Sequence, residues 1–131
     1  MANSIDKVFE KMGLSKNQSG YFYFHTAVQL ALKEPRILRR VTQTLYPAVA
    51  KKYGNTPAGI ERAMSHTIKC AWSSETPNLL TKFRKKPTNR VFIGYVADLV
   101  YYKNEYDLYK KKMEESEKQR LTQPAALPFL E

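Results

Sequence analysis

Residues 45–72 carry an end signal for one helix and, three residues later, a start signal for another. Pro47 suits the first turn of a helix, where its missing N–H costs nothing, and Gly54 suits the left-handed residue beyond a helix end. Thr56 and Pro57 then form a new start signal, because threonine is a good N-cap and proline a good first helical residue. The sequence therefore predicts a helix over about 47–53, a short turn, and a second helix over about 57–73.

The second of these helices has one apolar face. The apolar residues recur at helical spacing, namely Ile60, Met64, Ile68, Ala71 and Trp72. The residues that we expect on the opposite face are polar or small, namely Ala58, Gly59, Glu61, Arg62, Ser65, Lys69 and Ser73. Ala50 provides a small side chain where the two helices cross, and Ile60 fills the angle between them. This pattern predicts a helix-turn-helix, whose second helix typically lies in the major groove of DNA. An ordinary helical corner in an all-helical protein remains the alternative.

The charge distribution favours a polyanionic partner. The formal net charge is +10. Residues 1–101 hold 16 Lys and Arg against 6 Asp and Glu, whereas residues 102–131 hold 6 of each kind. The whole excess of positive charge therefore accompanies the helix-turn-helix, as expected for double-stranded DNA as the partner.

Helical periodicity extends over most of the chain. It predicts further helices over residues 4–12, 21–32, 37–46, 78–83 and 92 to about 119. We therefore expect an all-α fold, a compact domain of about five to six helices with an extended C-terminal helix. The expected divisions are an N-terminal helix or arm at 1–19, the DNA-binding domain at 20–100, a C-terminal helix extension at 101–120 and a flexible tail at 121–131.

Other features narrow the cellular setting. The single cysteine, Cys70, excludes an internal disulfide and fits a reducing compartment. The N-terminus lacks the apolar stretch of a signal peptide, and no run of residues is apolar enough to span a membrane. We expect a cytoplasmic, nucleoid-associated protein.

No catalytic constellation is visible in the sequence. His66 and Cys70 lie four residues apart, but two ligands do not make a zinc site, and a semi-buried histidine beside a core cysteine is the simpler interpretation. The sequence has no CxxC or HExxH motif, no glycine-rich phosphate loop and no clustered acid pair. We therefore expect no enzyme activity, no bound metal and no cofactor.

The stretch 20–98 resembles the DNA-binding effector domain of the stage-zero sporulation response regulator of endospore-forming bacteria. The matching residues are Leu45-Tyr46-Pro47, Ala50-Lys51-Lys52, Ile60-Glu61-Arg62-Ala63, His66, Ala71-Trp72-Ser73, Lys86-Pro87-Thr88-Asn89, Phe92-Ile93 and Val96-Ala97-Asp98. The resemblance implies an all-helical, sequence-specific regulator of transcription that often binds DNA as tandem protomers. A homodimer is the related possibility.

The resemblance also assigns roles on the second motif helix. The family's Glu-Arg pair at the base edges falls on Glu61 and Arg62. An arginine holds guanine O6 and N7 together, and a carboxylate accepts from cytosine N4. Glu61 has a second interpretation, as a charge that complements the helix dipole and orients Arg62. The other base-reading positions fall on Ala58, Gly59 and Ser65. The family usually has Ser, Arg and a basic residue there, so we expect a different DNA target.

Phosphate contacts are expected from residues around the motif. The candidates are Arg39, Arg40, Lys51, Lys52, Thr56, His66, Lys69, Lys85, Lys86, Thr88, Asn89 and Arg90. Asn89 has an alternative role as the cap of the last helix, with Thr88 beside it in a turn. A solvated charged face without a ligand is the general alternative for such a set.

Two expectations concern regulation. About 20 residues precede the match, too few for the family's phosphoacceptor receiver domain, so we expect control by another route. Four tyrosines after Asp98 either form a dimer or partner surface or pack on the domain's own core, namely Tyr101, Tyr102, Tyr106 and Tyr109. The alternative function is a protein-interaction module of the same fold that modulates another transcription regulator and binds DNA weakly or without specificity.

Overall fold

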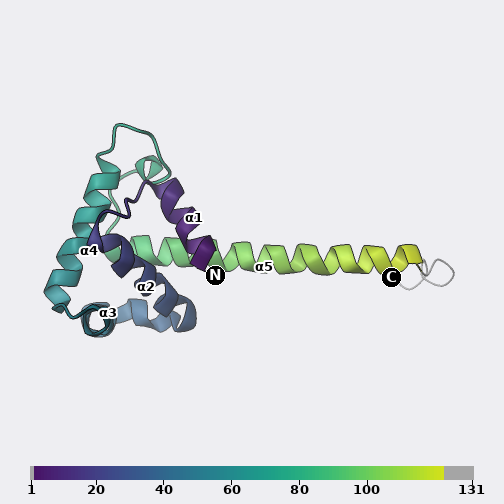
Figure 1. Cartoon of the computed structure of the whole chain (residues 1–131), viewed down its shortest axis with the longest axis horizontal. Helices are drawn as coiled ribbons and strands as arrows, with labels where there is room; N and C mark the ends of the chain where they lie inside the picture. Colours follow the sequence, from purple (N-terminus) through teal and green to yellow (C-terminus); the bar gives the residue numbers. More distant parts are fainter. Residues whose placement is uncertain (1, 123–131) are drawn as a thin grey trace. The chain divides into compact units, whose positions relative to one another are not determined.

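The computed structural model describes residues 2–122, with side chains described for residues 4–117. Within these residues the chain forms five α-helices and two short 3-10 helices and contains no strand (Figure 1). The elements are α1 (Ala2–Met12), α2 (Ser19–Lys33), η1 (Pro35–Arg40), α3 (Leu45–Tyr53), α4 (Pro57–Trp72), η2 (Leu80–Lys82) and α5 (Asn89–Thr122). The predicted all-α fold is confirmed. The predicted flexible tail lies outside the described residues, except for the last two residues of α5.

The chain divides into two units, Met1–Val100 and Tyr101–Glu131. The boundary falls inside α5, so the helix-turn-helix belongs wholly to the first unit. In the described part of the chain, no helix is both long and apolar enough to cross a membrane.

Helix α1 contributes to the core of the first unit. Its Phe9 is fully buried, and the Phe9 and Phe92 rings stack with centroids 6.0 Å apart. Phe92 also contacts Phe24 of α2, at 4.8 Å between centroids. The helix ends at Gly13, whose φ of +82° lies in the left-handed region that favours glycine. Residues that we expected to form a separate arm therefore share one core with α2 and the start of α5.

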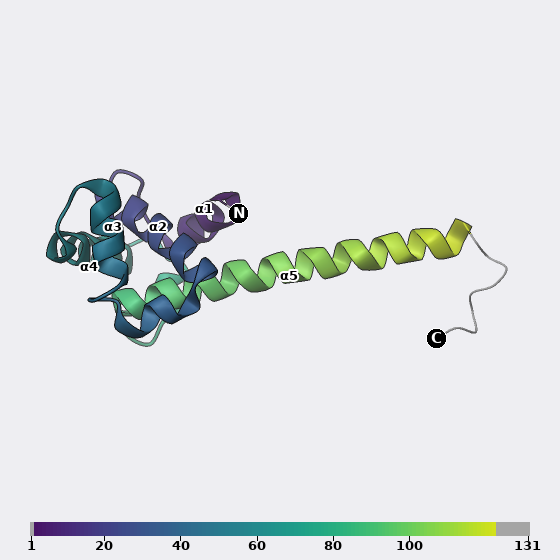
Figure 2. The same cartoon turned by 90° about the horizontal axis from the view of Figure 1, so that it is seen from below.

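Helices α2 and α4 approach closely at Gly20. A Cβ atom at this position would lie 2.1 Å from Thr67 Oγ1 and 2.5 Å from the carbonyl oxygen of Ala63. Thr67 is itself buried and donates its hydroxyl to that carbonyl at 3.0 Å. Only a residue without a side chain fits here, so Gly20 sets the distance between α4 and α2. Helix α2 also lies beside α3 (Figure 2).

The helix predicted over residues 37–46 is wrong. The structure instead has the 3-10 helix η1, a turn over residues 41–44, and α3 starting at Leu45. The Thr44 hydroxyl contacts two carbonyl oxygens, those of Arg40 at 2.7 Å and Ile37 at 2.9 Å. A threonine side chain that bonds the backbone in this way competes with helical hydrogen bonds. The apolar spacing correctly predicted which residues pack against the core, but it predicted an α-helix where the chain forms a 3-10 helix and a turn.

Candidate nucleic-acid interface

The turn between α3 and α4 has the geometry that the boundary signals predict. Gly54 adopts the left-handed conformation, with φ of 65° and ψ of 41°. The Thr56 hydroxyl caps α4 by accepting a hydrogen bond from the Gly59 N–H at 3.0 Å. Asn55 closes the turn, because its N–H donates to the Ala50 carbonyl and its side-chain oxygen accepts from the Thr56 N–H at 2.7 Å.

Helix α4 separates a buried face from an exposed one. Ile60 and Met64 are fully buried, and Ile68 is 1 % exposed. The residues exposed on the opposite side are Ala58, Glu61, Arg62, Ser65, His66, Lys69 and Cys70. The structure thus anchors α4 to the core along one stripe and leaves its polar face open to a partner.

Gly59 belongs to the turn rather than to the open face. It is half-buried, and a Cβ atom there would lie 2.4 Å from the side-chain oxygen of Asn55. The capping interactions of Asn55 and Thr56 therefore occupy the space that a side chain at this position needs. This gives a local reason why this chain lacks the arginine that the resembling family places at this position.

Asn89 joins three helices beneath the exposed face of α4. It is 7 % exposed, and its side-chain nitrogen lies 3.2 Å from the Tyr46 hydroxyl of α3. The same nitrogen donates to the Glu61 carbonyl of α4 at 3.2 Å and lies 3.1 Å from Ser65 Oγ, also on α4. The Ser65 hydroxyl in turn donates to the Asn89 side-chain oxygen at 3.4 Å. Thr88 caps α5, because its hydroxyl accepts from the Val91 N–H. Asn89 is therefore neither an available phosphate contact nor the helix cap, and its amide fixes α4 against α3 and α5.

Tyr46 forms the buried end of this network. Burial raises the pKa of its phenol, the hydrogen bond from Asn89 lowers it, and the nearby Glu61 carboxylate raises it. The net shift is upward, so the phenol stays protonated and neutral near neutral pH. The neutral hydroxyl still accepts the Asn89 N–H through an oxygen lone pair.

A basic segment borders the exposed face of α4. A surface hollow of about 460 Å³ has Glu61 and Ser65 of α4 on one side and Lys86, Thr88 and Arg90 on the other. Lys86, Thr88 and Arg90 are exposed, whereas the intervening Pro87 is buried. The buried proline anchors the segment, so two cationic side chains flank the hollow next to α4.

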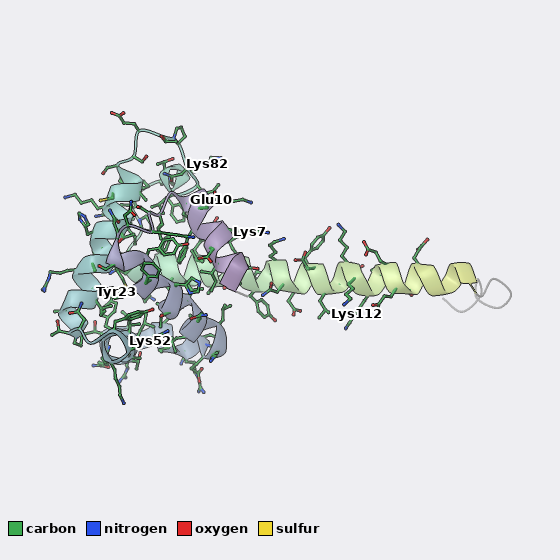
Figure 3. The ribbon with its side chains drawn as sticks, viewed as in Figure 1. Lys7, Glu10, Tyr23, Lys52, Lys82 and Lys112 are labelled. Atoms are coloured by element: carbon green, nitrogen blue, oxygen red, sulfur yellow. The ribbon has the colours of Figure 1, made fainter. Side chains whose placement is uncertain are left out.

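The remaining predicted phosphate residues fall into two groups. Five candidates are exposed and have no competing side-chain contact among residues 4–117, whose side chains the structure describes, namely Arg39, Arg40, Lys51, Lys69 and Lys85. Lys52 lies on α3 (Figure 3). Its ammonium donates to Thr26 Oγ1 at 3.3 Å and lies 5.3 Å from the Tyr53 ring centroid. The hydroxyl of Thr56 is used in its cap, and His66 Nε2 lies 3.5 Å from Cys70 Sγ. These three residues have partners within the protein.

Two tyrosines that the sequence analysis did not single out support the turn. The Tyr23 hydroxyl accepts from the Asn55 amide at 3.2 Å, and the Tyr23 and Tyr53 rings lie 5.1 Å apart. The Tyr53 hydroxyl forms a 2.7 Å hydrogen bond with Thr26 Oγ1. The aromatic start of α2 was visible in the sequence, but its partners are about 30 residues away and no local signal identifies them.

Metal-ligating side chains do not cluster in the part of the chain that the structure describes, where no group of three or more His, Cys, Asp or Glu residues is positioned to hold an ion. The contact between His66 and Cys70 shows that these residues do share one helical face, as their spacing predicts. Both side chains are exposed, so the interpretation of a semi-buried histidine beside a core cysteine is wrong.

An all-helical unit that anchors the second helix of a helix-turn-helix, leaves its polar face open and borders it with cations defines a DNA-binding domain. The sequence matches the family model described as "Sporulation initiation factor Spo0A C terminal" over residues 5–100. The chain belongs to this family, a DNA-binding domain of a regulator of sporulation transcription rather than a known enzyme family. The resemblance identified from the sequence is thereby confirmed, and residues 101–131 lie outside the match.

Proposed function

We propose that this chain is a sequence-specific regulator of transcription that places α4 in the major groove of double-stranded DNA. The observation that carries the proposal is the exposed face of α4, which bears Glu61, Arg62 and Ser65. Glu61 and Ser65 of this face line one hollow together with the cations Lys86 and Arg90. Such an arrangement supplies base-edge contacts and phosphate contacts on the same side of the protein.

Arg62 is the principal base-reading residue of the proposal. Its guanidinium is exposed near the N-terminus of α4, and it suits bidentate hydrogen bonding to guanine O6 and N7. The neighbouring Glu61 carboxylate can accept a hydrogen bond from cytosine N4, and the Ser65 hydroxyl can bond a donor or an acceptor on a base edge. Because Asn89 holds the Glu61 carbonyl and the Ser65 hydroxyl, the backbone that carries these side chains is fixed before DNA binds.

The phosphate contacts of the proposal come from exposed cations around α4. They are Arg39, Arg40, Lys51, Lys69, Lys85, Lys86 and Arg90, with the Thr88 hydroxyl beside them. Each neutralised phosphate releases counterions, so affinity should fall steeply as salt rises. Asn89 is not in this set because its amide is buried and hydrogen-bonded.

The test is a selection from a randomised duplex pool at about 0.15 M salt, where weak surface electrostatics are already screened. The wild type and Arg62→Ala are compared, with Arg36→Ala as a matched control, because Arg36 is exposed and paired with Glu34. We expect the wild type and the control to enrich one motif and Arg62→Ala to lose it. Retention of DNA without enrichment by the wild type would contradict the proposal.

A protein-interaction module of the same fold is the second candidate. The exposed tyrosines of α5 favour it, and so do Ala58 and Gly59, which stand where the family usually has Ser and Arg. In that case the chain would bind another transcription regulator through residues 101–122, and removal of the residues after Val100 would abolish capture. A truncated chain that still captures the regulator would count against this candidate.

A further inference from the structure

The part of α5 beyond the family match carries an exposed apolar stripe. Its members are Tyr102, Tyr106, Tyr109 and Met113, with exposed fractions of 66, 61, 61 and 52 %. Their spacings alternate between four and three residues, which is the repeat of a two-stranded coiled coil. This register assigns Tyr106 and Met113 to the a positions and Tyr102 and Tyr109 to the d positions. We call these four residues the tyrosine seam.

The charges beside the tyrosine seam are complementary between two parallel copies of the helix. In a parallel pair, each g residue faces the e residue five positions further along the other helix. Glu105 then faces Lys110 of the second copy, and Lys112 faces Glu117. One heptad earlier in the sequence, Asp98 and Lys103 have the same relation. Every pair in this register joins opposite charges.

An antiparallel pair does not give this complementarity. There, e residues face e residues and g residues face g residues. Keeping the tyrosine seam in contact then brings Lys103 near Lys110 of the other copy, a like-charge pair, and Glu105 near Lys112, an opposite-charge pair. Lys103 also forms an exposed intrahelical ion pair with Asp107 at 3.5 Å. Such an exposed pair is weak and does not prevent the lysine from serving a second carboxylate. The charges beside the seam thus complement those of a second copy of this chain, and they do so fully only in the parallel direction.

We propose that residues 102–117 of α5 form an interface with a second copy of this chain, parallel and in register along the tyrosine seam. Tyrosine suits such a surface because its ring is buried while its hydroxyl remains at the wet edge. The seam is shorter than the three to four heptads typical of an independently stable coiled coil, so the dimer is weak and sensitive to salt. Lys112, which holds a g position beside the seam, is exposed and projects from α5 (Figure 3).

A parallel dimer determines the symmetry of the DNA site, provided that the chain binds DNA as proposed above. A two-fold symmetric pair that engages both domains requires an inverted repeat, whereas tandem protomers require direct repeats. The interface itself is independent of DNA binding, so it is tested without DNA.

Disulfide trapping in the full chain tests the direction of pairing. In a Cys70→Ser background, Tyr102→Cys and Met113→Cys place single thiols near the two ends of the tyrosine seam. Lys111→Cys is the matched control, because residue 111 occupies the f position on the opposite side of the helix. In a glutathione buffer at up to about 1 mM protein, the regime of weak specific complexes, each seam variant should form at least about tenfold more disulfide dimer than the control.

Two results of this experiment would overturn the proposal. Crosslinking only in a mixture of the Tyr102→Cys and Met113→Cys chains would show an antiparallel pair. Dimer yields equal to that of Lys111→Cys in all samples would show that the tyrosine seam does not contact a second copy.

Charge exchange provides a second readout that involves no seam residue. Sedimentation equilibrium at low salt should show that Glu105→Lys weakens the dimer by at least about twofold, because the new lysine then faces Lys110. Adding Lys110→Glu should restore wild-type association, because the exchanged pair again joins opposite charges. A double variant no stronger than the single variant would contradict the parallel register. Because neither measurement involves DNA, failure of the interface is distinguishable from failure of the proposed function.

Discussion

The side-chain amide of Asn89 donates to the backbone carbonyl of Glu61 over 3.2 Å, across 28 positions of sequence. This bond connects the first turn of α5 to the part of α4 that carries Arg62. The position of the proposed base-reading residue therefore depends on a residue that does not itself face the partner.

Replacing Asn89 by alanine should destabilise the domain. The change leaves the buried Tyr46 hydroxyl without its donor and removes three contacts to α3 and α4. We expect a loss of about 1–3 kcal/mol in the free energy of unfolding, measured by urea titration. The exposed Asn17→Ala is the control and should cost less than about 0.5 kcal/mol. An Asn89→Ala chain as stable as the control would show that the Asn89 amide does not hold α4 in place.

Gly20→Ala should destabilise the packing of α2 against α4. The new methyl group meets Thr67 Oγ1 and a backbone carbonyl, and the carbonyl cannot rotate away as a flexible side chain does. We expect a loss of about 1–3 kcal/mol from overpacking, seen as a lower urea midpoint.

Gly94→Ala is the matched control for this substitution. Gly94 also lies inside a helix, but a Cβ atom there would lie at an ordinary contact distance of 3.5 Å from Leu38 Cδ1. Alanine should stabilise α5 there by up to about 1 kcal/mol, since it has the higher helix propensity. Equal effects of the two substitutions would contradict a specific close approach at Gly20.

Arg62→Ala and Lys86→Ala should affect DNA binding in different ways. If Arg62 reads a base, its loss costs about 1–3 kcal/mol at the preferred site and barely changes the salt dependence. If Lys86 contacts phosphate, its loss weakens preferred and random duplexes alike and lowers the salt slope by about one. Fluorescence anisotropy over a salt series separates the two patterns. Equal losses on both duplexes for Arg62→Ala would refute base reading by this residue.

Tyr21 should contribute to the loss of stability at high pH. Burial, the hydrogen bond to Asp6 at 2.7 Å and the charges of Asp6 and Glu10 raise the pKa of its phenol. The folded state therefore holds this proton more tightly than the unfolded state. The resulting stability is present below the unfolded pKa of about 10 and is lost as the pH rises above it.

Tyr21→Phe tests this contribution. The substitution should cost about 1 kcal/mol at pH 7 through the lost hydrogen bond and should make urea midpoints fall less steeply above about pH 10. An unchanged alkaline slope would show that Tyr21 does not drive the decline.

The local backbone pattern of the helix-turn-helix was predictable from the sequence. Pro47, Gly54, Thr56 and Pro57 act on their own dihedral angles or on hydrogen bonds within three residues, so their effect does not depend on the rest of the chain. The apolar stripe of α4 was predictable for the same reason, because helical periodicity is a property of one segment. These local signals, together with the family resemblance, were sufficient to predict the all-α class and the buried and exposed faces of α4.

Contacts between distant segments were not predictable in this way. Asn89 lay in a basic, polar stretch and was expected to face phosphate, yet tertiary packing buries it against residues 24–43 positions away. Lys52 was expected to be available to phosphate, but the fold places its ammonium beside Thr26 of α2. Segment 37–46 had helical spacing, but η1 ends at Arg40 and a turn follows, in which the Thr44 hydroxyl contacts the carbonyl oxygens of Ile37 and Arg40.

The sequence by itself determined where the motif helices begin and end and which face of α4 is apolar, because those properties arise from neighbouring residues. Only the tertiary structure decided which polar residues of the expected site remain available to DNA. A polar side chain bonds whatever partner the fold brings within about 3 Å, and burial makes an unpaired polar group costly. Asn89 therefore became part of the scaffold, while Arg62 remained on the exposed face of α4.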